Sequence, residues 1–276
     1  MTGGGLAPVF AAARTRIGLI VLLLGLAGLA WWRTAAEMRG MDAGPWSGLG
    51  TLGWFVGLWA VMMAAMMFPS VAPTIALYSR LTREQSLVSP LLFAAGYLVT
   101  WVGAGVVAFG VAAAGSNLTG DVLSWDRGGR WAGGVTVVLA GVYELTPLKD
   151  VCLGKCRSPL GSLLVSWRGG RLGALQMGMK NGVWCVGCCW ALMASLFALG
   201  VMSIVWMSVI AGLIAGEKLI PWRRVATYGT TLMLVGLGAL LFIAPGAIPG
   251  LSTPDSHRMS PMENMGPLMA GSPLSR

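Results

Sequence analysis

The sequence predicts an all-α fold, a polytopic membrane helical bundle, from its composition, its apolar segments and its glycine content. Of the 276 residues, 56% are hydrophobic and only 11% are charged, whereas a soluble domain carries about 25% charged residues. The apolar residues form long continuous runs, and a membrane-spanning helix needs about 20 such residues. The 41 glycines suit the close helix–helix approach that membrane bundles use.

Seven apolar segments predict about seven transmembrane helices, or six if one boundary is absent. They cover 17–35, 51–77, 88–114, 131–147, 175–198, 200–219 and 225–245. The first follows Arg14 and Arg16, and we interpret it as an uncleaved signal anchor rather than a cleaved signal peptide. Pro69 and Pro73 are expected to bend or end the second helix. Only a few residues around Gly200 separate the fifth segment from the sixth.

The basic residues predict how the bundle is oriented. With the N-terminus inside, the inner loops carry 13 Lys and Arg residues and the outer loops carry 6. The positive-inside rule therefore favours an N-in, C-out arrangement. The predicted parts are a cytoplasmic N-terminal segment (1–16), a transmembrane domain (17–245) with a cytoplasmic Cys-containing loop (148–174), and a disordered, Met-rich extracytoplasmic tail (246–276). Because this orientation explains the net charge of +9, nucleic-acid binding is not expected.

The five cysteines form two clusters, both predicted on the cytoplasmic side. Cys185, Cys188 and Cys189, in "NGVWCVGCCWALM" (181–193), share one face of a helix. Cys152 and Cys156, in "YELTPLKDVCLGKCRSP" (143–159), lie in the loop after the fourth span. Cytoplasmic thiols stay reduced, so metal coordination or redox chemistry is favoured over a disulfide. The alternative is that these cysteines only fill a core.

A methionine pattern in the second span points to the same metal chemistry. In "WAVMMAAMMFPS" (59–70), Met62, Met63, Met66 and Met67 share one helix face and approach the cytoplasmic half. Methionine is also a common flexible core filler. Thioethers select soft ions such as Cu(I) when thiolates lie nearby.

Two acidic residues near the inner ends of spans are further candidate ligands. Glu144 lies near the inner end of the fourth span and Glu217 near the inner end of the sixth. Carboxylates inside a membrane are costly and usually functional. The alternative is that both lie at the membrane interface, paired with Lys149 and Lys218.

The tail supplies a third candidate set of ligands. In "HRMSPMENMGPLM" Met259, Met262, Met265 and Met269 recur every three or four residues behind His257. Thioethers still bind Cu(I) outside the cell, so the tail is a predicted copper-capture segment. His257 is the only histidine, which excludes multi-histidine metal sites and histidine-dependent triads within the membrane.

Four motifs resemble those of a known family. They are "WAVMMAAMMFPS" (59–70), "TPLKDVCLGKCRSP" (146–159), "NGVWCVGCCWALM" (181–193) and "GEKLIP" (216–221). In this order, over roughly residues 50–245, they are similar to bacterial domain-of-unknown-function family 2182, whose members are described as metal-binding integral membrane proteins. The resemblance implies a multi-pass protein of the bacterial inner (cytoplasmic) membrane, with a metal site at the matching Met, Cys and Glu positions. It implies no activity.

These observations favour a protein that binds, transfers or transports a soft metal, with Cu(I) preferred over Zn(II). The tail would capture the ion, the Met face relay it and the Cys cluster receive it. Besides the lipid bilayer, expected partners are a metal chaperone or a membrane complex. One alternative is a thiol-redox membrane enzyme, although an enzyme is less favoured than a binding protein. The other is a structural subunit of a membrane complex.

Overall fold

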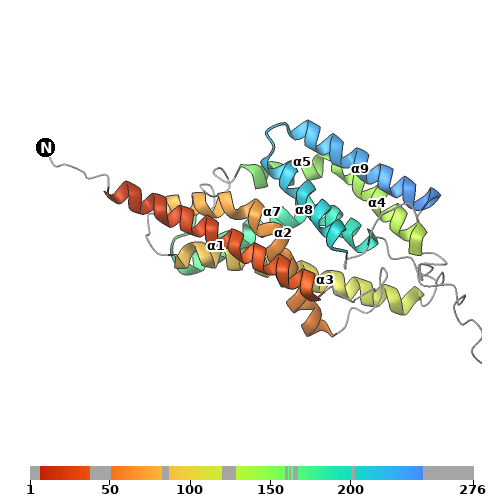
Figure 1. Ribbon diagram of the computed structural model, residues 1–276, viewed down its shortest axis with the longest axis horizontal. Helices are drawn as coiled ribbons and strands as arrows, with labels where there is room; N and C mark the ends of the chain where they lie inside the picture. Colours follow the sequence, from red (N-terminus) through yellow and green to blue (C-terminus); the bar gives the residue numbers. More distant parts are fainter. Residues whose placement is uncertain are drawn as a thin grey trace, which may run out of the picture.

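The computed structural model describes residues 7–37, 51–82, 87–119, 129–158, 161, 163, 167–199 and 203–244. Regular structure among these residues is helical, without strands, which confirms the all-α prediction (Figure 1). The helices are α1 (Ala7–Glu37), α2 (Leu52–Leu81), α3 (Val88–Thr119), α4 (Arg130–Glu144), α5 (Pro147–Arg157), α7 (Gly170–Leu199), α8 (Ile204–Leu219) and α9 (Arg223–Ile243).

Five of the described helices, α1, α2, α3, α7 and α9, are long and apolar enough to cross a membrane. A sixth span results if α4 and α5, which meet at an angle of 67°, are one broken span. Helix α8 has 16 residues, so it is about 24 Å long, shorter than the ~30 Å hydrocarbon core. A helical bundle with apolar helices of membrane-spanning length is therefore confirmed, whereas the count of seven and the N-in, C-out orientation stay predictions.

The break between α4 and α5 is encoded by a short capping sequence. Helix α4 ends at Glu144, and the Thr146 side chain accepts a hydrogen bond from the backbone N–H of Lys149 at 3.4 Å. Pro147 follows at the first turn of α5, where its missing N–H costs nothing. The predicted loop 148–174 therefore begins with a helix, and that helix carries Cys152 and Cys156.

The prolines of α2 do not end the helix, which continues to Leu81. A proline within a helix leaves the carbonyl four residues earlier without its intrahelical partner. Pro69 does this to Ala65, and the indole N–H of Trp31 on α1 donates to the Ala65 carbonyl at 3.1 Å. Helix α1 thus packs along α2 (Figure 1) and satisfies a backbone group that hydrocarbon could not.

Glycines bring α3 close to α7. A Cβ on Gly178 would collide with the backbone of Phe93, and one on Gly96 with the backbone of Leu175. The hydroxyl of Thr100 also donates across this interface to the carbonyl of Met179, at 3.1 Å. Small residues at helix crossings are the usual way to pack helices in lipid, so this pair forms a tightly packed unit.

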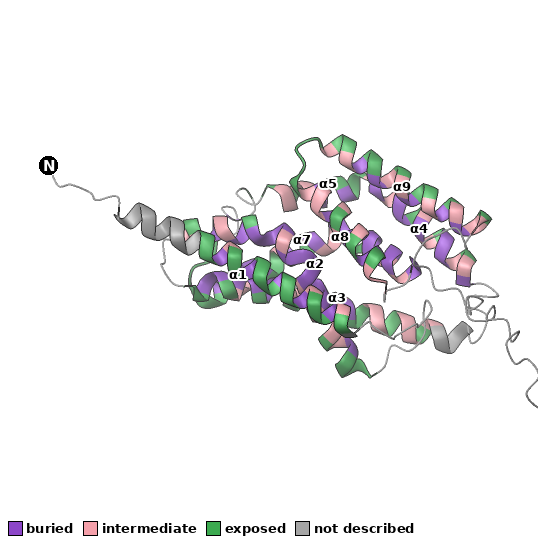
Figure 2. Ribbon diagram, in the orientation of Figure 1, coloured by how far each residue is buried: buried purple, intermediate pink, exposed green. Residues whose placement is uncertain are grey.

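Burial shows which helices lie at the centre of the bundle. In the apolar windows of α2 and α7, 61% of the residues are buried, against 28% in α1 and α9. Figure 2 shows the same contrast, with the exposed residues of α1 and α9 facing outward. The two central helices are therefore the ones that carry the predicted Met and Cys faces.

Candidate metal centre

The cysteines of α7 lie on the inner face of this central helix. Cys185, Cys188 and Cys189 are each at most 2% exposed, whereas Val183 and Trp190 are 59% and 50% exposed. Residues three and four apart share a helix face, so the spacing "CVGCC" turns all three thiols inward. The predicted face is confirmed.

The sulfur atoms of these cysteines lie close together. The Sγ atoms of Cys185, Cys188 and Cys189 are all within 4.8 Å of one another. Cys188 Sγ is 3.3 Å from Cys189 Sγ and 3.6 Å from Cys156 Sγ on α5. All of these cysteines are free thiols. Two elements separated in sequence thus bring four soft ligand atoms to one place.

Cys185 has two polar partners besides the thiols. Its Sγ lies 2.9 Å from the hydroxyl of Tyr97 on α3 and 3.0 Å from the ammonium of Lys218 on α8. Lys218 also approaches the hydroxyl of Ser70 on α2, at 3.4 Å. A positive charge in contact with sulfur offsets the negative charge of a thiolate, which would otherwise be costly to bury.

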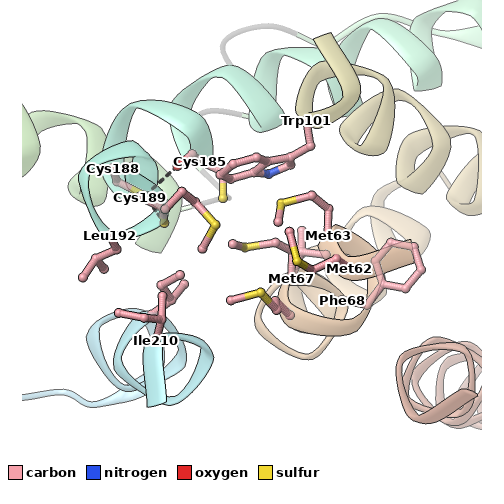
Figure 3. Packing of buried hydrophobic residues seen from close by; sticks show 14 of the residues in the cluster. Met62, Met63, Met67, Phe68, Trp101, Cys185, Cys188, Cys189, Leu192 and Ile210 are labelled. Atoms are coloured by element: carbon pink, nitrogen blue, oxygen red, sulfur yellow. Dashed lines mark hydrogen bonds between the residues drawn. The ribbon is translucent and has the colours of Figure 1, made fainter. Parts of the chain in front are cut away.

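The Met face of α2 meets the cysteines from the other side of the core. Met62, Met63, Met66 and Met67 are each at most 2% exposed and belong to the same hydrophobic cluster as the α7 cysteines. Figure 3 shows Met62, Met63 and Met67 extending from α2 toward the cysteines of α7. The predicted Met face is therefore confirmed as a buried surface beside the thiols.

Helix α5 is fixed to α8 by an arginine next to Cys156. The guanidinium of Arg157 donates to the carbonyl oxygens of Glu217 and Ile220, at 2.8 and 2.6 Å. Carbonyls at a helix C-terminus lack intrahelical partners, so Arg157 satisfies them and holds Cys156 in position. Cys152, one turn earlier, lies beside Gly187 of α7 and outside the group of three clustered thiols.

The two predicted acidic ligands lie in a separate group. Glu144 and Glu217 both form ion pairs with Lys149 of α5, and the Lys149 Nζ–Glu217 Oε2 distance is 2.6 Å. The three side chains are at most 2% exposed. The expected pair of Glu144 with Lys149 is present, but Glu217 also contacts Lys149, while Lys218 faces Cys185 instead. Both carboxylates are therefore buried and ion-paired, and their position at the membrane interface stays a prediction.

The comparisons with known proteins agree with a copper-related site. Residues 56–241 match the model of the PpoB2 family, described as a copper chaperone. The chain belongs to this family. The motif resemblance pointed to domain-of-unknown-function family 2182, which is not the family that the match names. No curated protein and no solved structure matches the chain.

The match includes the site and excludes the tail. Helices α3 to α8 lie wholly within residues 56–241, as does the Met face of α2. His257, Met259, Met262, Met265 and Met269 lie outside both this range and the described residues. Copper capture by the tail stays a prediction.

Three contributors to the site were not among the predicted ligands. Tyr97, Lys218 and Ser70 come from three different helices: Tyr97 and Lys218 contact Cys185, and Ser70 contacts Lys218. Ser70 shares the α2 face with the methionines, so the helical spacing placed it correctly without indicating its role. The sequence around Tyr97 does not indicate this contact, because Tyr97 lies 88 residues from Cys185 along the chain.

Proposed function

We propose that this protein is a membrane copper chaperone that holds Cu(I) on the thiols of Cys185, Cys188 and Cys189, with Cys156 as a fourth sulfur donor. The observation that carries the proposal is the group of three buried thiols within 4.8 Å of one another. Thiolates are soft ligands and favour Cu(I). Membership of a copper chaperone family supports copper as the metal.

The surroundings of the thiols favour Cu(I) over Zn(II). Structural zinc sites take four ligands, which can all be cysteines, so the preference for Cu(I) rests on the buried charge. Two thiolates, one Cu(I) ion and the Lys218 ammonium sum to zero charge. The same set with Zn(II) would carry a positive charge in a buried site, which is costly.

The methionines of α2 support a route to and from the thiols. Met62, Met63, Met66 and Met67 offer neutral thioethers beside the cysteines, and neutral soft ligands can bind Cu(I) without a change in protonation. In this proposal the ion crosses the bundle along the Met face. The bilayer is the bacterial inner membrane, and the copper-accepting partner is a metal chaperone or a membrane complex.

Thiol redox chemistry is the second candidate function, favoured by the Cys188–Cys156 sulfur distance of 3.6 Å. These residues lie on different helices, so a disulfide between them does not need the strained link of adjacent cysteines. The redox proposal expects this pair to cycle between thiol and disulfide. The copper proposal expects both cysteines to stay reduced. Bound Cu(I) should then protect their thiols from alkylating reagents.

The experiment titrates Cu(I) into the detergent-purified full chain against a colorimetric Cu(I) chelator. The wild type is expected to compete with the chelator, and the triple variant Cys185→Ser, Cys188→Ser, Cys189→Ser is expected to lose one equivalent of tightly bound Cu(I). Val183→Ala is the matched control, because Val183 lies on the exposed face of α7. Equal copper binding by the triple variant would contradict the proposal.

A further inference from the structure

A buried charge group lies beside the thiol site and is made by three helices. Glu144 ends α4, Lys149 lies in the first turn of α5 and Glu217 lies near the end of α8. Both carboxylates contact the single ammonium of Lys149. We call Glu144, Lys149 and Glu217 the carboxylate triad, although it contains two carboxylates and one ammonium. With all three groups ionised, it holds one uncompensated negative charge. Burying a net charge is strongly unfavourable, so one positive charge is missing.

The carboxyl groups also have unused oxygens. Glu144 Oε1 and Glu217 Oε1 are buried and have no hydrogen-bond partner among the described residues. A buried polar atom without a partner is destabilising. These oxygens belong to the two carboxyl groups that meet at Lys149, so one small ion between them could satisfy both.

The neighbouring charged and titratable groups are engaged elsewhere. On α4, the hydroxyl of Tyr143 donates to the carbonyl of Gly187. On α5, Asp150 pairs with Arg223 of α9. The Arg157 guanidinium donates to backbone carbonyls of α8 and its C-cap.

The remaining neighbours also do not balance the triad. Lys218 of α8 faces the thiol of Cys185, and the thiols of α7 contact one another. Cys152 of α5 lies against α7 at Gly187. Among the described residues, Lys149 is thus the one cation in contact with the two carboxyl groups.

We propose that the carboxylate triad is a binding site for one monovalent cation, either H⁺ or Na⁺, held between Glu144 and Glu217. A single positive charge makes the group neutral and supplies a partner for the free oxygens. Carboxylate oxygens are hard ligands, so the site does not select Cu(I). The adjacent Lys149 ammonium repels divalent ions, because a second charge would make the group positive.

The triad and the thiol site share two helices, which provides a physical basis for coupling. On α8, Glu217 reaches the triad while the next residue, Lys218, reaches Cys185. On α5, Lys149 holds the carboxylates and Cys156 approaches Cys188. If the proposed copper function holds, occupation of the triad by the cation changes the affinity for Cu(I), and the reverse must also hold.

The test measures the cation directly on the purified full chain, without copper. One arm records the infrared band of a protonated carboxyl group, and the other measures bound radioactive Na⁺ by equilibrium dialysis. The wild type is expected to show either the band or one bound Na⁺ per chain. Glu144→Gln and Glu217→Gln should each abolish that signal, because one carboxylate and Lys149 already form a neutral pair.

Asp150→Asn is the matched control, since it removes a carboxylate of α5 that is 53% exposed and paired with Arg223. It should leave the signal unchanged. A wild type with neither the band nor bound Na⁺ would overturn the proposal. So would a signal that persists in both glutamine variants.

A copper titration then separates this proposal from the copper function. Cu(I) affinity of the wild type should change about fivefold or more with the concentration of the identified cation, and Glu217→Gln should reduce that dependence. A protein that binds the cation but no Cu(I) would contradict the copper function and leave the triad site intact. A Cu(I) affinity with the same cation dependence in the wild type and in Glu217→Gln would contradict the coupling.

Discussion

The thiol site and the carboxylate triad share helices α5 and α8, yet they differ in how their buried charges are balanced. With one thiol of Cys185, Cys188 and Cys189 ionised, the Lys218 ammonium is balanced, so the empty site carries no net charge. Glu144 and Glu217 both contact the Lys149 ammonium, so this group depends on a charge partner. The comparison teaches that the thiol site can release Cu(I) and remain stable, whereas the carboxylate triad is destabilised when it loses a positive charge.

The largest expected effect comes from removing the central cation of the triad. Lys149→Met leaves two buried carboxylates without an ammonium, and breaking a buried ion pair in this way costs about 3–5 kcal/mol. The expected result is a much lower thermal unfolding temperature in detergent. The control Asp150→Asn breaks only the exposed pair with Arg223, which is worth at most ~1 kcal/mol. Equal stability of Lys149→Met and wild type would show that the triad is not a charge-dependent group.

A smaller effect is expected when the corresponding cation is removed from the thiol site. Lys218→Met deletes the ammonium that lies 3.0 Å from Cys185 Sγ. Residues that support metal ligands in this way typically change affinity about 10- to 100-fold, so Cu(I) affinity should fall by at least tenfold. Stability without copper should change less than in Lys149→Met, and Lys218→Arg should restore part of the affinity. An unchanged Cu(I) affinity in Lys218→Met would show that Lys218 does not contribute to Cu(I) binding.

The smallest effect is expected from the hydroxyl of Tyr97. Tyr97→Phe removes a 2.9 Å contact with Cys185 Sγ and preserves the ring, so packing against α7 is kept. A single hydrogen bond contributes about 0.5–1.5 kcal/mol, which predicts a few-fold loss of Cu(I) affinity in the same titration. A loss larger than that of Lys218→Met would reverse the expected order and place Tyr97 closer to the ion than the ammonium.

Helical spacing was sufficient to predict the buried Met and Cys faces. The Met residues of α2 and the Cys residues of α7 recur at three and four positions, and both faces are buried where expected. The low charge content likewise predicted a membrane bundle. The number of spans was harder to predict, because composition does not show where a helix begins, and α8 begins only at Ile204.

The polar partners could not be read from the sequence. Lys149 and Glu217 are 68 residues apart, and local reasoning paired Glu217 with its neighbour Lys218. Adjacent helical residues point in different directions, so Lys218 faces Cys185 while Glu217 faces α5. Such pairings depend on which helices touch, and the sequence pattern alone does not contain that information.

X-ray absorption at the copper edge, on the full chain loaded with one equivalent of Cu(I), tests the central claim most directly. The account predicts a Cu(I) ion with sulfur ligands alone, and the same spectrum for the Glu144→Gln and Glu217→Gln variants. Replacing the three α7 cysteines with serine should abolish that spectrum. Nitrogen or oxygen ligands in the wild type, or a spectrum altered by either glutamine variant, would contradict a soft thiol site separate from the carboxylate triad.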